Sequence, residues 1–153
     1  MSRPAVHHDV VRPEWIDYNG HLSEPYYVLV FGDATTALME RTGMDAGYRD
    51  ATCCSLYTVE AHVRYLREIG PGADLEVTTR VLGRDAKRLR LWHELRSGGR
   101  LCATEELMCL HVGPEGTVPF PDGVAAELDA LLTDAPEPEH AGRAVQGVAR
   151  PPT

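Results

Sequence analysis

The feature that most restricts the fold is a helical stretch with apolar side chains on every side. Residues 26–31 read Tyr-Tyr-Val-Leu-Val-Phe, and a helix of this composition has no polar face to turn toward water. Pro25 suits the first turn of a helix, and Gly43 marks a stop directly after Thr42. The pattern therefore predicts one long helix that is buried all round by the rest of the domain.

Alternation of apolar and polar residues predicts the strands that surround this helix. The expected strands are Val6–Val11, Leu56–Leu66, Leu75–Leu82, Leu89–Leu95 and Leu101–Val112. The links at residues 70–72, 83–85 and 97–99 are rich in Gly and typical of hairpin turns. We therefore expect consecutive strands to pair as an antiparallel meander, which together with the helix gives an α+β fold.

The end of the chain differs in composition from the part that precedes it. Residues 121–132 predict a short helix, whereas residues 133–153 are rich in Pro, Ala, Gly and charge. A segment with so few large apolar groups buries little surface on folding. We expect a single domain at residues 1–132 and a flexible tail at residues 133–153.

Composition excludes several functional classes. The chain has 153 residues and a formal net charge of −8, which argues against a general nucleic-acid partner. No stretch approaches the roughly 20 apolar residues of a membrane span, and the first residues lack a signal-peptide core, so we expect a cytoplasmic protein. Four cysteines without a Cys-x-x-Cys pair and seven scattered histidines predict neither a disulfide framework nor a metal site.

The segment just before the helix carries the clearest chemical pattern. Residues 15–22 read Trp-Ile-Asp-Tyr-Asn-Gly-His-Leu and so place a carboxylate, an amide and an imidazole within five residues. The Asp17 carboxylate can act as a base or nucleophile, while a helix start offers unpaired N–H groups to an oxyanion. This combination suits hydrolysis of an activated acyl group. The alternative is that Asp17 only hydrogen-bonds nearby backbone N–H groups, as turn carboxylates do.

Residues 17–21, Asp-x-Asn-Gly-His, followed by Tyr27, resemble the motif of hotdog-fold acyl-CoA thioesterases of the 4-hydroxybenzoyl-CoA type. Ser23 and Glu24 stand where that family usually has two asparagines. The resemblance continues through residues 55–66 and is closer to the betainyl-CoA thioesterases of carnitine degradation, which also occur fused to carnitine dehydrogenases. It implies an antiparallel sheet wrapped around one long central helix. It also implies a homodimer or homotetramer that hydrolyses betainyl-CoA without a metal or cofactor.

The resemblance also implies roles for the motif residues. Asp17 would be the catalytic carboxylate, attacking the thioester carbonyl or activating a water molecule. Asn19 and His21 would orient the loop or the acyl group, although structural roles are equally compatible with the pattern. The backbone N–H at Glu24 is the expected oxyanion donor, by analogy of position.

Residues outside the motif complete the expected site. Glu60 and His62 share one face of a strand, which is either a solvated face or a pocket wall where Glu60 assists the water. Asp33 lies within the apolar helix and either bonds a strand residue or faces the ligand. Aromatic residues, which are either core or a binding site for a cationic acyl group, are Trp15, Tyr18, Tyr26, Tyr27 and Tyr57.

A local basic cluster is the expected site for the phosphates of CoA in this acidic protein. Its members include Lys87, Arg88 and Arg90, and the alternative is a solvated turn. Other functions remain open at this stage. They are a thioesterase for aromatic or short-chain acyl groups, and a non-catalytic acyl-CoA-binding module. A dehydratase is disfavoured because the chain has no suitably placed His-x-x-x-x-Pro-Gly stretch.

Overall fold

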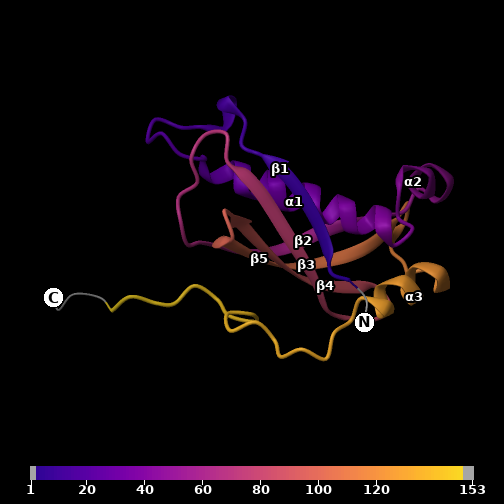
Figure 1. Cartoon of the computed structure of the whole chain (residues 1–153). Helices are drawn as coiled ribbons and strands as arrows, with labels where there is room; N and C mark the ends of the chain where they lie inside the picture. The colour runs from indigo at the N-terminus through magenta and orange to yellow at the C-terminus, as the bar shows by residue number, and fades with distance from the viewer. Residues whose placement is uncertain (1–2, 150–153) are drawn as a thin grey trace.

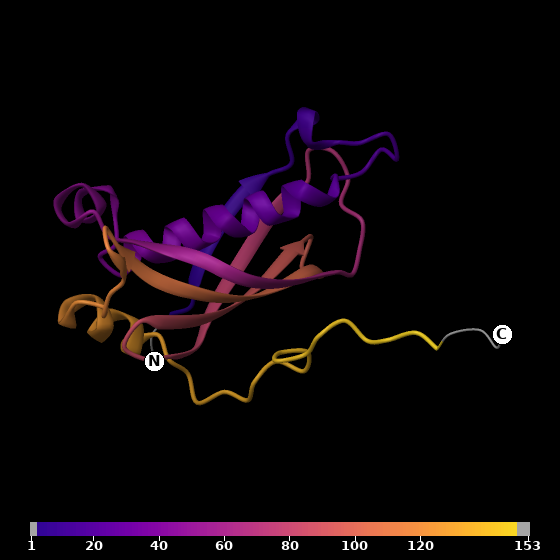
Figure 2. The ribbon, with the colours of Figure 1, turned by 180° about the vertical axis from the view of Figure 1, so that it is seen from behind.

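The structure, a computed structural model, describes residues 3–149 and shows an antiparallel sheet that curls around a long helix (Figures 1 and 2). The helices are α1 (Glu24–Arg41), α2 (Ala46–Thr52) and α3 (Asp122–Ala130), with a 3-10 turn at Pro13–Trp15. The strands are β1 (Ala5–Val10), β2 (Ser55–Tyr65), β3 (Asp74–Arg84), β4 (Arg88–Ser97), β5 (Arg100–Gly113) and β6 (Gly116–Thr117). The expected α+β hotdog architecture is confirmed.

Helix α1 ends as the sequence predicts, because Gly43 takes a φ of +91° that disfavours any residue with a side chain. The prediction that the helix is buried all round is wrong. Phe31 is fully buried, whereas Val28 and Leu29 are 44% and 45% exposed. The reason is that α1 packs on β1, β3 and β4. The inner face of the sheet beside β2 is therefore less covered by the helix of the same chain.

The strand order differs from the expected meander. The sheet runs β1-β3-β4-β5-β2, so β2 pairs with β5 rather than with its sequence neighbour β3. The link at residues 66–73 therefore crosses from one edge region of the sheet to the other and is not a hairpin. Strands β3, β4 and β5 do form consecutive antiparallel pairs. The two outermost strands of this path are β1 and β2.

A bulge in β2 changes which side chains share a face. The register shifts between Thr58 and Glu60, so that Thr58 lies opposite Cys109 and Ala61 opposite Leu107. A bulge inserts one unpaired residue and reverses the alternation beyond it. The prediction that residues 57–65 alternate without interruption is therefore wrong, and Tyr57 lies on the same outer face as Glu60.

The inner face of the sheet and α1 enclose the core, which includes one buried polar group of note. His93 is fully buried and hydrogen-bonds the hydroxyls of Thr35 (2.9 Å) and Thr79 (2.8 Å). Burial lowers the pKa of His93 to about 3, so the ring is neutral. Both ring nitrogens are satisfied, which identifies His93 as a structural link between helix and sheet.

Two segments lie outside this helix-and-sheet unit. Helix α2 was not predicted, although Asp45 caps it by accepting from the N–H of Tyr48 (2.8 Å). Residues 133–149 follow α3 along the face of the sheet opposite α1 (Figures 1 and 2). No helix in residues 3–149 has the length and apolar character needed to cross a membrane.

Candidate active site

The motif loop, residues 16–23, is a closed turn between the 3-10 turn and α1. Ile16 and Leu22 form an antiparallel bridge, and the N–H of Asp17 donates to the carbonyl of His21 (3.0 Å). The N–H of Gly20 donates to the carbonyl of Asp17 (2.9 Å), and Gly20 has a φ of +78°. Glycine is favoured there because this backbone conformation is strained for other residues.

The Asp17 carboxylate is partly buried and contributes to this turn. One of its oxygens accepts a hydrogen bond from the N–H of Asn19 (2.8 Å). This hydrogen bond to a nearby backbone N–H is the structural role that the sequence offers as the alternative to catalysis. It uses one lone pair of one oxygen, and the carboxylate retains further acceptor capacity. A structural and a chemical role for Asp17 are therefore compatible.

The start of α1 lies directly after the motif loop. The N–H of Ser23 is used, because it donates to the carbonyl of Trp15 (2.8 Å). Glu24 is the first residue of the helix, and Pro25 has no N–H to offer. Within residues 3–149, the Glu24 N–H has no backbone acceptor. The helix dipole makes this position attractive to negative charge.

A cleft opens beside the motif loop. The loop at residues 66–73 lies against it (Figure 1): the N–H of Leu22 donates to the carbonyl of Ile69 (2.8 Å), and His21 Nε2 lies 3.4 Å from Glu68 Oε2. The cleft has a volume of about 640 Å³. Its lining residues are Tyr27, Tyr65, Leu66, Arg67, Glu68, Ile69, Gly70, Ser97, Arg100 and Cys102.

Tyr27 connects the cleft with the motif loop. Its hydroxyl donates to the carbonyl of Arg67 (3.2 Å), and its ring stands perpendicular to that of Tyr65 with centroids 5.1 Å apart. Burial, together with nearby acidic groups that include Asp17, raises the pKa of Tyr27 to about 12. The phenol therefore stays protonated and can donate hydrogen bonds at neutral pH.

The aromatic residues around the motif do not form an open cage. Trp15 is buried and stacks on Tyr26, with centroids 5.6 Å apart and planes at 17°. The Arg12 guanidinium lies 4.9 Å from the centroid of Trp15, so a protein cation already contacts this ring. Tyr18 is 98% exposed. Of the expected aromatic residues, Tyr27 is the one that lines the cleft.

Several expected site residues lie away from the motif loop within the single chain. Asp33 is nine positions beyond Glu24 on α1, beside β1. Tyr57, Glu60 and His62 lie on the outer face of β2, and the bulge described above is what brings Tyr57 onto the same face as the other two. Glu60 and His62 line a cavity of about 350 Å³ beneath tail residues 142–144.

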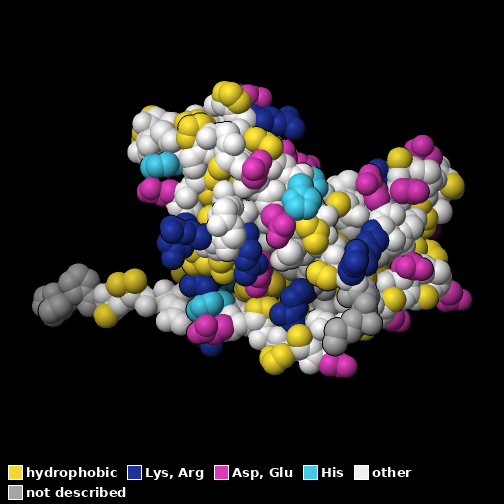
Figure 3. Space-filling model, viewed as in Figure 1, with side chains coloured by type: hydrophobic (Ala, Val, Ile, Leu, Met, Phe, Trp, Pro, Cys, Tyr) yellow, Lys and Arg dark blue, Asp and Glu magenta, His cyan; other side chains and the backbone are white. Residues whose placement is uncertain are grey.

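The basic cluster is closely surrounded by acids. Arg88 Nε lies 2.6 Å from Asp85, and Arg90 pairs with both Glu106 (3.0 Å) and Glu137 (2.6 Å). On the face that Figure 3 presents, Lys and Arg side chains are likewise interspersed with Asp and Glu. These pairs offset much of the positive charge that would attract a phosphate group.

Glu105 is a buried acid that sequence reasoning missed. It is 3% exposed on the inner face of β5, opposite Val63 on β2 and His93 on β4. Burial raises the pKa of Glu105 to about 7. The alternation of β5 contains a signal for this burial, since Glu105 lies on the same face of the strand as the apolar residues Leu107 and Cys109.

Sequence reasoning also missed most of the cleft. Arg67 and Glu68 lie in the loop that begins after β2 ends at Tyr65, and Arg100 begins β5. No spacing in the sequence relates them to residues 17–21, because the crossover at residues 66–73 brings them together.

Comparisons with known proteins place the chain in a family. A family profile described as "Thioesterase-like superfamily" matches residues 11–128. The betainyl-CoA thioesterase of Pseudomonas aeruginosa is 44% identical over 142 residues, covering 88% of this chain and 89% of that protein. The L-carnitine dehydrogenase/betainyl-CoA thioesterase of Agrobacterium fabrum is 46% identical over 148 residues, covering 94% of this chain but 30% of that protein.

Solved structures show the same arrangement. A putative thioesterase from Pseudomonas putida superposes with a TM-score of 0.83 at 34% identity, covering 97% of this chain and all of that chain (100%). A Staphylococcus aureus protein solved in complex with CoA gives a TM-score of 0.89 at 25% identity, covering 95% and 96%. This chain therefore belongs to the thioesterase-like superfamily and has the hotdog fold of that family.

Proposed function

We propose that this protein is a thioesterase that hydrolyses betainyl-CoA to betaine and CoA. The observation that carries the proposal is the position of Asp17 on a closed turn directly before the start of α1, where the Glu24 N–H has no backbone acceptor within residues 3–149. The similarity to betainyl-CoA thioesterases extends over most of the chain and supports the choice of acyl group. A cytoplasmic location is part of the proposal, and the four free cysteines fit a reducing compartment.

The proposed chemistry joins the carboxylate with the helix start. Asp17 attacks the thioester carbonyl, which breaks the C–S bond, releases the CoA thiolate and leaves a mixed anhydride that water cleaves. Alternatively, Asp17 takes a proton from water, and the resulting hydroxide attacks the same carbon, after which the C–S bond breaks and the CoA thiolate leaves. In both routes, the Glu24 N–H stabilises the oxyanion. Asn19 and His21 hold the loop, with His21 oriented by Glu68.

The two routes differ in the origin of the oxygen added to betaine. A single turnover in ¹⁸O-labelled water, with enzyme in excess, puts label directly into betaine if Asp17 is a base. If Asp17 is the nucleophile and water attacks its carboxyl carbon in the anhydride, betaine leaves with an unlabelled Asp17 oxygen and the label enters Asp17. Mass spectrometry of the betaine and of the peptide that contains Asp17 distinguishes this outcome from the base route.

We place the CoA group in the cleft beside the motif loop. Arg67 and Arg100 line that cleft, and within residues 3–149 their guanidinium groups form no ion pair. Arg88 and Arg90 already face carboxylates, so they are the weaker candidates for binding phosphate. Arg guanidinium groups suit phosphate because their planar N–H donors match its oxygens.

We further propose that the protein is a homodimer, or a homotetramer built from such dimers. Strand β2 is outermost on its side of the sheet, and Val59 in its bulge is 56% exposed. Val28 and Leu29 on α1 add exposed apolar surface on the side that the sheet of the same chain covers less. Pairing through β2 would cover this surface and satisfy the open strand edge.

The dimer proposal is tested by light scattering with matched edge-strand variants. Val59→Lys places a charge at the β2 edge and is expected to shift the protein toward monomer. Val6→Lys alters a similarly exposed valine (44%) on β1 at the other edge and should leave the assembly unchanged. A wild-type monomer, or equal behaviour of both variants, would overturn the proposal.

The activity is tested by thiol release from betainyl-CoA, benzoyl-CoA and butyryl-CoA. We expect betainyl-CoA to have the highest kcat/KM, and Asp17→Asn to lose at least ~10²-fold in kcat. Glu14→Gln removes an exposed acid from the adjoining 3-10 turn and serves as the control. A higher kcat/KM for benzoyl-CoA or butyryl-CoA would reassign the substrate. Binding of CoA without release of thiol would indicate a non-catalytic module.

A further inference from the structure

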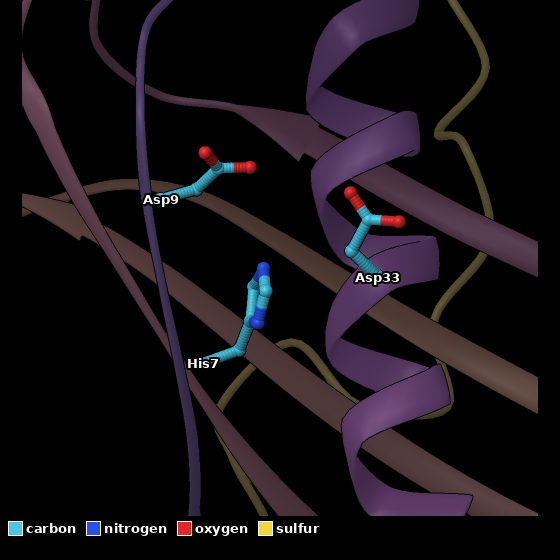
Figure 4. Close-up of side chains that lie close together, drawn as sticks. All are labelled: His7, Asp9 and Asp33. Carbon is cyan, nitrogen blue, oxygen red and sulfur yellow. The ribbon is translucent and has the colours of Figure 1, made fainter.

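A group of potential metal ligands lies on the opposite side of α1 from the open β2 edge. Alternation along β1 directs His7 and Asp9 to the inner face of the sheet, in the same row as buried Ala5. Asp33 projects toward them from α1, and Figure 4 shows the imidazole and the two carboxylates around a common space. One ligand atom from each residue lies within 4.8 Å of the other two.

The imidazole of this group has one ring nitrogen without a hydrogen-bond partner among the described residues. His7 Nε2 is buried and has no hydrogen-bond partner within residues 3–149. This contrasts with His93, whose two ring nitrogens both have partners. Buried polar atoms in folded proteins almost always have a partner, so an orphaned nitrogen facing two carboxylates indicates an ion or water between them.

Charge favours an ion over water. Two carboxylates held this close repel each other, and a divalent cation would neutralise both while accepting the lone pair of a neutral imidazole. One Asp9 oxygen accepts the N–H of Val10 (2.8 Å), which orients the carboxylate. Ligand atoms bonded to one ion at about 2.1 Å lie roughly 3–4 Å apart, so small side-chain rotations close the site.

We infer that His7, Asp9 and Asp33 form a binding site for a divalent first-row transition metal ion, of the kind represented by Zn²⁺ or Mn²⁺. One imidazole and two carboxylates provide the mixed nitrogen and oxygen ligands that these ions accept. The site was not expected from the sequence, because its ligands are separated along the chain and follow no metal-binding spacing.

The position of the site indicates a structural role. Asp33 lies nine residues along α1 from Glu24, or roughly 13 Å at 1.5 Å per residue, so the ion would not reach the motif loop. An ion held by His7, Asp9 and Asp33 joins the outermost strand β1 to the central helix. Metal binding is therefore expected to stabilise the fold and to leave the thioester chemistry to Asp17.

The test is isothermal calorimetry of the full chain, freed of metal with chelator, titrated with Zn²⁺ and separately with Mn²⁺. We expect one site of micromolar or tighter affinity for at least one ion, and a rise in Tm on adding that ion. His7→Ala and Asp33→Asn should each weaken this binding at least ~10-fold and remove the rise in Tm. His8→Ala is the matched control, because His8 is exposed on the outer face of the same strand.

Binding weaker than about millimolar in the wild-type chain would overturn the inference, as would equal affinity in His7→Ala and His8→Ala. Asp33 is exposed on the helix, so Asp33→Asn should fold even if His7→Ala does not. Unchanged affinity in Asp33→Asn would then overturn the site as assigned. The readouts do not depend on catalysis, so they stand apart from the proposed function.

Discussion

Replacing Glu105 with Gln should make the protein more stable, and increasingly so as the pH rises. Burial raises the pKa of Glu105 from 4.5 to about 7 in the folded chain, while the unfolded chain keeps the ordinary value. Below the ordinary value both states are protonated, and the side chain carries no ionisation penalty. As pH rises toward the folded pKa, the unfolded state loses its proton first, so stability is lost.

The size of the effect follows from the shift. One pKa unit corresponds to about 1.4 kcal/mol, so the full penalty approaches about 3 kcal/mol once pH exceeds the folded pKa. Glutamine has nearly the same shape and never ionises. Between about pH 5 and about pH 8, the stability of Glu105→Gln relative to wild type should therefore grow by about 2–3 kcal/mol.

Urea unfolding followed by tryptophan fluorescence measures this difference, since Trp15 and Trp92 are both 4% exposed and report loss of the core. Protein concentration is held constant because assembly contributes to apparent stability. Glu127→Gln, an exposed acid on α3, controls for the loss of one surface carboxylate. If the unfolding free energies of Glu105→Gln and wild type differ by the same amount at every pH, burial does not raise the pKa of Glu105 as we describe.

Three further outcomes are expected. Arg67→Ala and Arg100→Ala should each raise KM for acyl-CoA by roughly 10-fold with little change in kcat. A pantetheine thioester lacks the nucleotide of CoA, so an equal rise in KM for that substrate would exclude contact between these arginines and the nucleotide phosphates. Cys53→Gly should stabilise the chain by about 0.5–1 kcal/mol in urea unfolding, because Cys53 has a φ of +54°; a loss of stability would contradict this reasoning. His93→Leu should lower the unfolding free energy by about 1–3 kcal/mol, because it leaves the buried Thr79 hydroxyl without a partner, while Thr35 keeps its hydrogen bond to the carbonyl of Phe31 (3.1 Å). A neutral effect would show that water replaces the ring.

The elements of this fold were predictable where local chemistry decides them. The stop of α1 follows from a glycine with positive φ, and β3 and β4 follow from alternation. Strand order was not predictable in this way, because pairing β2 with β5 depends on the path of the whole chain. The same limit explains why Tyr57 was assigned to the face opposite Glu60 and His62: a bulge is invisible to a simple period of two.

The candidate site likewise contains residues that the local sequence brings together and residues that only the whole fold brings together. Asp17 and the start of α1 are close in sequence, so their juxtaposition could be anticipated. The cleft residues Arg67 and Arg100 come from separate elements and required the fold. The pairing of Arg90 with Glu106 and Glu137 likewise joins β4, β5 and the tail, which no local pattern reports.

The strand order also determines when each part of the chain can fold. Strands β1 and β2 come first in sequence, yet β1 pairs with β3 and β2 with β5. During synthesis, the apolar helix α1 emerges from the ribosome well before the sheet that covers it. The hairpins of β3, β4 and β5 join sequence neighbours and close quickly, whereas the two outer strands await distant partners. Newly made chains therefore expose apolar surface until β5 is complete, and this interval is when aggregation competes with folding.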